Sequence, residues 1–164
     1  MIDMKVVVMG VAGSGKSTLG AAIAKELNCP FIDADDLHPE ENITHMSSGR
    51  PLTDAMRWPW LDACGASLKE NDAVVLGCSA LKRSYRDRLR IFVPDLQLVY
   101  PNIPEAVIRK RFEGREGHFM PDQLITSQFE TLEEPHEDED ATVIAAALSI
   151  GQAAKLAASH LLAK

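Results

Sequence analysis

Two patterns of apolar residues alternate along the chain. Short continuous apolar runs predict strands, and apolar residues repeated every three or four positions predict helices. Short apolar runs rich in β-branched residues are typical of strands in a parallel sheet. Runs that predict strands lie at residues 5–9, 29–33, 73–79 and 96–100, with an alanine-rich fifth candidate at 141–147. Helices are predicted at 59–71, 81–90, 104–112 and 122–132, around Leu19, Ile23 and Leu27, and along Ile150, Ala153, Ala154, Ala157 and Leu161.

This order predicts an α/β fold in which a five-stranded parallel sheet carries helices on both faces. With 164 residues, the chain is expected to form a single domain over 1–164. A segment rich in turn-forming residues separates the second strand from the helix at 59–71. Pro59 is expected near the first turn of that helix, where proline is tolerated.

Composition narrows the class of protein. Apolar residues make up 46% and charged residues 25% of the chain, which is typical of a soluble globular protein. No apolar run approaches the roughly 20 residues that span a bilayer. The net charge of −7 argues against nucleic acid or an anionic membrane as the main partner. The acidic run "EEPHEDED" at 133–140 is interpreted as a solvated connection, with a metal or partner site as the alternative.

The three cysteines are Cys29, Cys64 and Cys78. Their number is odd and no pair has CxxC spacing, so the sequence favours neither a disulfide framework nor a zinc site. A reducing cytoplasm is consistent with this pattern.

The first strand leads into "GVAGSGKS", which satisfies GxxxxGK[ST] with a strand before it and an amphipathic helix after it. Glycines let the backbone curl so that N–H groups point at phosphate oxygens, and the helix N-terminus adds its positive end. Lys16 is expected to reach the outer phosphates of ATP, and the Ser17 hydroxyl to bind Mg²⁺. The predicted nucleotide-binding residues are Gly10, Val11, Ala12, Gly13, Ser14, Gly15, Lys16, Ser17 and Thr18.

The chain lacks the signatures of two large classes of phosphate-loop protein. It has no NKxD stretch to read guanine, and the strand at 73–77 continues into "CSALK" without an acidic residue. A small phosphate-loop kinase fits these absences best.

Two aspartates at the end of the second strand are candidates for the acceptor side. Asp33 and Asp35 lie two residues apart, so an extended segment would point both toward the phosphate loop. One of them could hold Mg²⁺ through water while the other accepts a hydrogen bond or proton from the acceptor hydroxyl. Solvent-facing turn residues are the alternative.

Arginine and lysine concentrate in several motifs, and an anionic acceptor would need some of them. The glycines and charges of "GREGHFMP" predict a mobile lid, at about residues 113–122, that excludes water from the reaction.

Several motifs together resemble the small bacterial and eukaryotic gluconokinases. They are "GVAGSGKST", "DADDLHPEENITHMSSGRPLTD", "RWPWL", "CSALKRSYRDRLR", "GHFMP" and "SQFETLEEP". The resemblance implies ATP-dependent phosphorylation of D-gluconate at its 6-hydroxyl, a sheet of order 2-3-1-4-5 and a lid. It also implies a cytoplasmic location and a homodimer.

The resemblance carries over roles motif by motif. Lys16, Asp35 and Arg115 would be catalytic, with Asp35 at the acceptor hydroxyl, and Ser17 and Asp33 would hold the metal. The acceptor-binding segment would span about 35–60. The implied acceptor-binding residues are Asp33, Asp35, His38, Arg57, Ser79, Lys82, Arg86 and His118, with packing or helix capping as the alternative for His38.

Two positions depart from the family pattern. His45 stands where a lysine is usual, and Met56 stands where an acidic residue is usual. Because methionine is a weak acceptor, Arg57 is expected to be less firmly oriented. A shikimate-kinase-like enzyme and a non-catalytic nucleotide-binding module remain alternatives. The sequence lacks the Gly-Gly stretch that a shikimate kinase is expected to carry after the third strand.

Overall fold

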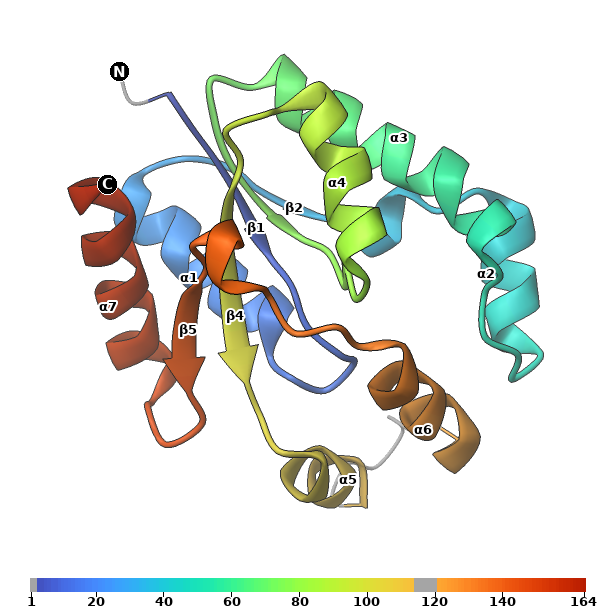
Figure 1. The fold of residues 1–164 in the computed structure, drawn as a ribbon. Coiled ribbons are helices and arrows are strands. Elements are labelled where there is room, and N and C mark those ends of the chain that lie inside the picture. The colour runs from blue at the N-terminus through green and yellow to red at the C-terminus, as the bar shows by residue number, and fades with distance from the viewer. Residues whose placement is uncertain (1–2, 114–120) are drawn as a thin grey trace.

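A five-stranded parallel sheet forms the centre of the molecule (Figure 1), in a computed structural model that describes residues 3–113 and 121–164. The strand order is β2-β3-β1-β4-β5, and every neighbouring pair is parallel. This confirms the predicted α/β class, the parallel sheet and the implied strand order. The strands are β1 (Met4–Val8), β2 (Phe31–Asp33), β3 (Ala73–Gly77), β4 (Gln97–Asn102) and β5 (Thr142–Ala145).

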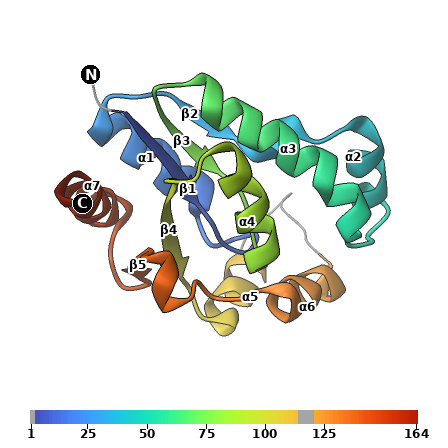
Figure 2. The ribbon, with the colours of Figure 1, turned by 45° about the horizontal axis from the view of Figure 1, so that its top comes forward.

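Helices cover both faces of the sheet and its carboxyl edge (Figures 1 and 2). α1 and α7 lie on one face, α3 and α4 on the other, and α5 and α6 lie beyond the carboxyl ends of β1 and β4. The helices are α1 (Lys16–Leu27), α2 (Glu40–Ser47), α3 (Asp54–Glu70), α4 (Arg83–Phe92), α5 (Glu105–Glu113), α6 (Asp122–Thr131) and α7 (Ile150–Ala163). Two short 3₁₀ helices are η1 (Ala34–Leu37) and η2 (Glu137–Glu139).

The strands supply two separate cores because successive side chains point to opposite faces. Val7 and Leu98 pack with the apolar side of α3 and α4. Val6 and Val99 pack with α1 and α7. All four side chains are fully buried, and each such burial contributes roughly 1.5–3 kcal/mol. Burial on both faces explains why the runs are continuously apolar rather than alternating.

Two expectations for helix positions need correction. Thr53 accepts a hydrogen bond from the Met56 N–H, and α3 therefore begins at Asp54. This places Pro59 inside the helix rather than in its first turn, where it leaves one backbone carbonyl without its usual donor. Ile150, expected on the buried side of the last helix, is 42% exposed at the first position of α7.

The turn-rich segment also contains structure that the sequence did not predict. α2 occupies residues 40–47 of it, after Pro39, and Gly49 follows in a left-handed conformation. Within 3–113 and 121–164, no helix is both long and apolar enough to cross a membrane.

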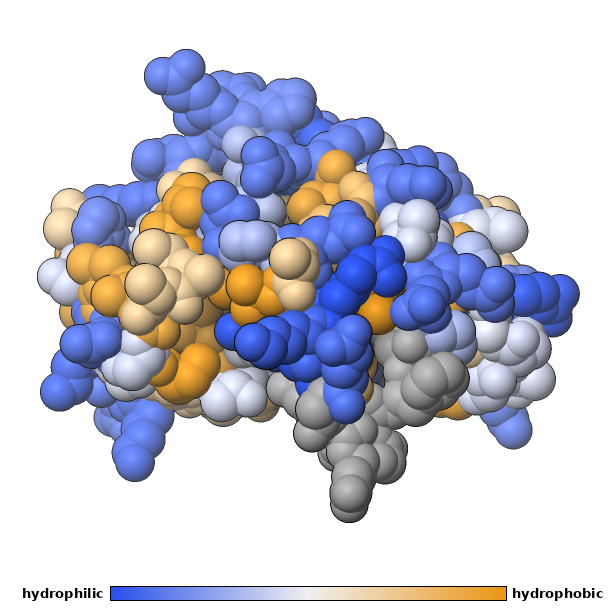
Figure 3. Space-filling model, turned by 90° about the horizontal axis from the view of Figure 1, so that it is seen from below, coloured by the Kyte–Doolittle hydropathy of each residue, from blue (hydrophilic) through white to orange (hydrophobic). Residues whose placement is uncertain are grey.

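Ligands of open parallel sheets bind at the carboxyl ends of the strands. Figure 3 views the molecule from below Figure 1, the side toward which β4 and β5 point. Apolar residues gather on the left of this face, on the side of α7 and β5, while its middle is polar. The same edge holds the loop after β1, η1 and the loop after β3.

Candidate active site

The loop between β1 and α1 has the backbone of a phosphate cradle. Gly13 and Gly15 have φ angles of 82° and 83°, a left-handed conformation that favours glycine. A Cβ on Gly13 would also lie 2.7 Å from the ring of Phe112. Gly15 caps the N-terminus of α1, so the positive end of the helix opens directly onto the loop.

Lys16 and Ser17 begin α1 beside the end of β2. The Ser17 hydroxyl donates to Asp33 Oδ2 at 3.3 Å. Burial lowers the pKa of Lys16, while the nearby carboxylates of Asp35 and Asp33 act in the opposite direction. A partly desolvated cation at this position can attract phosphate oxygens more strongly than a fully hydrated one.

Asp33 and Asp35 reach the loop by a different geometry from the predicted extended segment. The chain turns into η1 directly after Asp33, and the Asp33 carboxylate accepts the Asp35 N–H at 2.9 Å. Asp33 therefore faces Ser17, while Asp35 lines a cavity that Lys16 also lines. The expectation that both aspartates lie by the loop is met, but the extended segment it relied on is wrong.

A cavity of about 840 Å³ lies next to the phosphate loop. Its walls come from the loop, η1, α2, α3, the loop after β3, and α6. Of the residues predicted from the sequence, Ala12, Lys16, Asp35, His38, Arg57 and Ser79 line it.

His38 is held against the wall of this cavity. Its ring stacks on Trp60, with centroids 4.2 Å apart, and Trp60 in turn donates to the Ala34 carbonyl at 2.7 Å. Asn42 Nδ2 lies 3.2 Å from His38 Nδ1. Burial lowers the pKa of His38, an effect that Arg57 reinforces and Asp35 opposes. A neutral ring that accepts at Nδ1 has its proton on Nε2, so His38 can both pack and donate.

Arg57 is oriented by a cluster of α3 and α4 side chains. Its Nη1 donates to the Tyr85 hydroxyl at 2.8 Å and lies 3.5 Å from the Asp54 carboxylate. The Tyr85 hydroxyl donates onward to Asp54, and this hydrogen bond lowers the pKa of Asp54. The guanidinium also stands 5.0 Å from the centroid of the Tyr85 ring. Met56 therefore does not leave Arg57 loose, because Asp54 and Tyr85 hold it.

The other unusual position, His45, donates from Nε2 to the Pro51 carbonyl at 2.9 Å. Neither His45 nor Met56 contributes to the cavity wall. Lys82 does not contribute to it either. Its ammonium lies 3.6 Å from Asp54 and 5.6 Å from the centroid of the Tyr85 ring.

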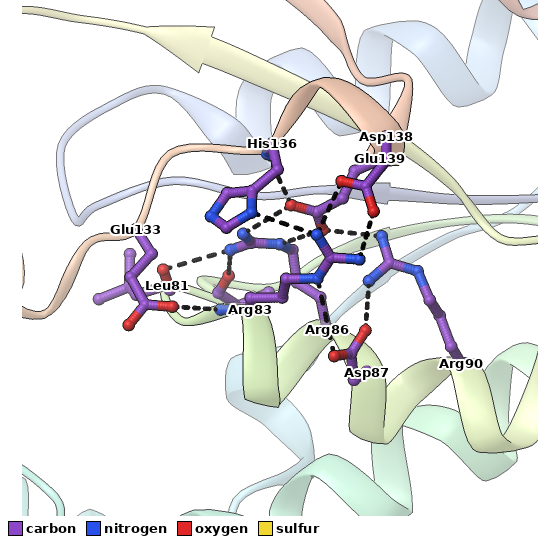
Figure 4. Close-up of polar contacts among 10 residues, drawn as sticks. Leu81, Arg83, Arg86, Asp87, Arg90, Glu133, His136, Asp138 and Glu139 are labelled. Atoms are coloured by element: carbon purple, nitrogen blue, oxygen red, sulfur yellow. Dashed lines mark hydrogen bonds and ion pairs between the residues drawn. The ribbon is translucent and has the colours of Figure 1, made fainter.

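The prediction that Arg86 binds the acceptor is wrong. Its side chain is 0% exposed. Nε and Nη2 donate to the two oxygens of Glu139 at 2.7 and 3.0 Å, and Nη1 donates to the carbonyls of Ala80 and Leu81 at 2.9 and 3.2 Å (Figure 4). Every nitrogen of this guanidinium is engaged inside the protein, so Arg86 is a structural residue.

Most of the acidic run at 133–140 is exposed, as expected of a solvated connection, but the run also pairs with α4. Asp138 forms a two-pronged pair with Arg83 at 2.7 and 2.8 Å, and Glu139 also accepts from Arg90 at 2.8 Å (Figure 4). Burial by itself would raise the pKa of Glu139, but hydrogen bonds from Arg86, the His136 N–H and Arg90 outweigh it and lower the pKa to about 2. The run therefore ties the segment before β5 to α4.

The same network fixes the loop after β3, which lines the cavity. Glu133 donates its N–H to the Leu81 carbonyl at 2.7 Å, and its carboxylate accepts the Arg83 N–H at 2.9 Å. Arg115 and His118, predicted for the lid, lie outside the described residues.

Two residues near the phosphate loop had no role from the sequence. Arg111 on α5 donates to the Gly13 carbonyl at 2.7 Å. Gln128 on α6 accepts the Ala12 N–H at 2.6 Å. The basic cluster at 109–111 and the motif "SQFETLEEP" contained them, but neither pattern indicates a contact with the loop.

A second, smaller cavity of about 260 Å³ lies on the other side of the phosphate loop. Ser14, Thr18 and Arg111 form its polar side. Ile144, Leu148 and their neighbours between β5 and α7 form its apolar side. The loop thus adjoins two cavities: the smaller one beside β5 and α7, and the larger one that holds Lys16, Asp35, His38 and Arg57.

Comparisons with known proteins agree with this geometry. A family model described as "AAA domain" matches residues 6–137. The thermoresistant gluconokinase of Escherichia coli K12 is 46% identical over 137 residues, covering 81% of this chain and 78% of that protein. The crystal structure of a gluconokinase from Sinorhizobium meliloti 1021 is 46% identical with a TM-score of 0.91, covering 99% of this chain and 93% of that one.

Shikimate kinase from Aquifex aeolicus has a TM-score of 0.65 at 19% identity, covering 98% of this chain and 97% of that one. That likeness concerns the fold alone. The close relatives share both the fold and nearly half of the aligned residues, so this chain belongs to the gluconokinase family.

Proposed function

We propose that the protein transfers the γ-phosphoryl group of ATP to the 6-hydroxyl of D-gluconate, giving 6-phosphogluconate and ADP. The observation that carries the proposal is the large cavity, where the phosphate-loop residue Lys16 faces Asp35, His38 and Arg57. Donor and acceptor groups would thus meet in one cavity. The names of the relatives support gluconate as the acceptor.

The donor side is the phosphate loop and the smaller cavity. N–H groups of the loop, the N-terminus of α1 and the Lys16 ammonium would bind the phosphates of ATP. The smaller cavity adjoins the loop at Ser14, Gly15 and Thr18 and is largely apolar, which suits a flat heteroaromatic base. Arg111 lies between the loop and this cavity, where it would support the nucleotide.

Ser17 and Asp33 fit a magnesium site because they place a hydroxyl and a carboxylate 3.3 Å apart at the end of the loop. Oxygen ligands of this kind are those that Mg²⁺ prefers, with phosphate oxygens and water completing the shell. When bound, the ion would neutralise charge on the phosphates during transfer.

The acceptor side would hold gluconate through both of its chemical features. Arg57 presents a fork of donors that matches the carboxylate. The His38 Nε2–H and the Ser79 hydroxyl would bind hydroxyls along the chain. Asp35 would accept the hydrogen bond of the 6-hydroxyl, direct that oxygen toward the γ-phosphorus and take its proton as the bond forms.

Coupled turnover of ATP with a panel of acceptors tests the proposal. Gluconate should give ATP-dependent product, whereas shikimate and neutral polyols of the same length should not. If another small acid is phosphorylated and gluconate is not, the assignment fails. Titration of gluconate against the protein with a non-hydrolysable ATP analogue separates a kinase from a non-catalytic nucleotide-binding module.

The remaining parts of the proposal concern the protein's setting. We infer a cytoplasmic homodimer without nucleic-acid or membrane partners, supported by the family resemblance and by the net charge of −7. Light scattering on the purified protein tests the dimer, and a monomer at working concentration would contradict it.

A further inference from the structure

Gln128 makes an unusual contact with the phosphate loop. Its Oε1 accepts the N–H of Ala12 at 2.6 Å, although the two residues lie 116 positions apart in the chain. The N–H groups of such a loop are normally donors to phosphate. Here one of them binds a side chain of α6 and orients it.

The contact lies at the boundary between donor and acceptor sides. Ala12 and Gln128 both line the large cavity, together with Lys16 and Asp35. The later loop residues Ser14 and Gly15 line the smaller cavity instead. Gln128 is therefore placed where the loop meets the proposed acceptor side, away from the smaller cavity.

The chemistry of the carboxamide determines what Gln128 offers to this space. Only its oxygen can accept the Ala12 N–H, so the contact fixes which way the amide points. Along 3–113 and 121–164, no residue accepts a hydrogen bond from Gln128 Nε2. An oriented, neutral donor in a cavity with Lys16 suits an oxygen that carries negative charge.

We propose that Gln128 is a further residue of the phosphoryl-transfer site, whose Nε2–H donates to an oxygen of the transferring phosphoryl group. The inference rests on the proposed kinase function. A donor held in place before the reaction stabilises charge in the transition state without reorganising. The N–H of Ala12 supplies that preorganisation, because it belongs to the backbone of the phosphate loop and fixes the orientation of the Gln128 amide.

A merely structural role makes different predictions. If Gln128 only tethers α6 to the loop, its loss lowers the melting temperature or the affinity for nucleotide. If it only forms a wall of the acceptor cavity, its loss raises KM for gluconate. If it donates to the moving group, its loss lowers kcat and leaves those quantities close to wild type.

Two substitutions separate these roles. Gln128→Met keeps the length of the side chain and removes both hydrogen bonds. Gln128→Glu keeps an acceptor for the Ala12 N–H but removes the donor and adds negative charge. Gln123→Glu is the matched control, because Gln123 lies on the same helix, is exposed and touches the Gly49 carbonyl only at 3.4 Å.

The measurements are kcat, KM for gluconate and for ATP, melting temperature, and affinity for ADP with and without aluminium fluoride, which mimics the moving phosphoryl group. Both Gln128 variants should lose about 100-fold in kcat, as for the loss of one oriented donor, and bind ADP with aluminium fluoride correspondingly more weakly. Affinity for ADP alone, melting temperature and the Gln123→Glu control should match wild type.

Wild-type kcat in Gln128→Glu would overturn the proposal, as would a change confined to melting temperature, ADP affinity or KM for gluconate. If the wild-type protein does not phosphorylate gluconate, the proposed function fails by itself. The affinity for ADP with aluminium fluoride still decides the role of Gln128 in that case, because it requires no acceptor. Equal affinity in wild type and Gln128→Met would refute that role.

Discussion

Arg57 on α3 contacts Tyr85 of α4, and Arg86 is the next residue of α4, yet the two arginines occupy opposite kinds of environment. Arg86 is wholly buried, and all its nitrogens are engaged by Glu139 and two carbonyls. Arg57 keeps a side-chain exposure of 16%, lines the cavity, and uses Nη1 for its contacts with Tyr85 and Asp54. A guanidinium that is wholly buried, with each nitrogen donating inside the protein, is not available to a ligand.

The two arginines also differ in how their charge is balanced. Glu139 cancels the charge of Arg86 in a two-pronged pair of which the carboxylate side chain is only 1% exposed. Asp54, which is 46% exposed, faces Arg57, Lys82 and the Tyr85 hydroxyl at once. Two cations share this one carboxylate, so the cluster keeps a positive charge beside the cavity, as binding of a carboxylate requires.

Removing Arg86 should have the largest effect. We expect Arg86→Ala to reduce the free energy of unfolding by about 3–5 kcal/mol, because it leaves the charge of Glu139 buried without its main partner. Urea denaturation measures the loss. Arg88→Ala is the control on the same helix, since its pair with Asp62 is 39% exposed on both sides and should contribute about 1 kcal/mol or less. Equal losses in the two variants would erase the distinction between buried and exposed arginines.

The same ion pair should make stability depend on acid pH. The pKa of Glu139 in the folded protein is about 2, below its ordinary value of 4.5. The stabilisation is therefore complete above about pH 4.5 and is lost as pH falls toward about 2, an effect on the order of 3 kcal/mol. Denaturation curves across this range should show it. Glu139→Gln should be less stable at neutral pH and show a smaller change on acidification, and an unchanged slope would contradict the assignment.

Arg57 should affect binding rather than folding. We expect Arg57→Ala to raise KM for gluconate about 30-fold, since a charge-assisted hydrogen bond contributes roughly 2 kcal/mol. The melting temperature should change little. Arg57→Lys should recover only part of the loss, because an ammonium lacks the planar fork. A KM for gluconate that stays at the wild-type value would remove Arg57 from the acceptor site.

The fold was predictable because its signals are local. Strands buried on both faces appear as continuous apolar runs, such as residues 5–9 and 96–100. The glycines and the lysine of the phosphate loop form a recognisable sequence motif. Segments with weaker signals were misjudged. α2 lies in a stretch of turn formers, and Pro59 sits inside α3 because Thr53 caps the helix six residues earlier.

The side chains around the site were harder to predict because their partners are distant in sequence. Arg86 lies three residues before the buried Leu89 and next to the buried Tyr85, so helical spacing alone put it on the apolar side of α4. A basic residue on an apolar face needs a buried carboxylate, and Glu139 supplies it from 53 positions away. No local pattern identifies that partner. Gln128 and Ala12 illustrate the same limit at the phosphate loop.

Tyr85 gives the test with the smallest expected effect. Its hydroxyl accepts a hydrogen bond from Arg57 Nη1 and leaves Nε and Nη2 available to a ligand. Tyr85→Phe removes the hydroxyl that accepts from Arg57 and donates to Asp54, while the direct approach of those two residues at 3.5 Å remains. We expect KM for gluconate to rise about fivefold, or about 1 kcal/mol, with kcat unchanged.

Because Tyr85 is argued to act through Arg57, its substitution should have almost no further effect in an Arg57→Ala background. A double-mutant cycle in KM for gluconate measures this coupling. Additive effects, or a fall in kcat with KM unchanged, would mean that Tyr85 acts on the substrate by a route of its own. In that case orientation of Arg57 would have to come from Asp54 alone.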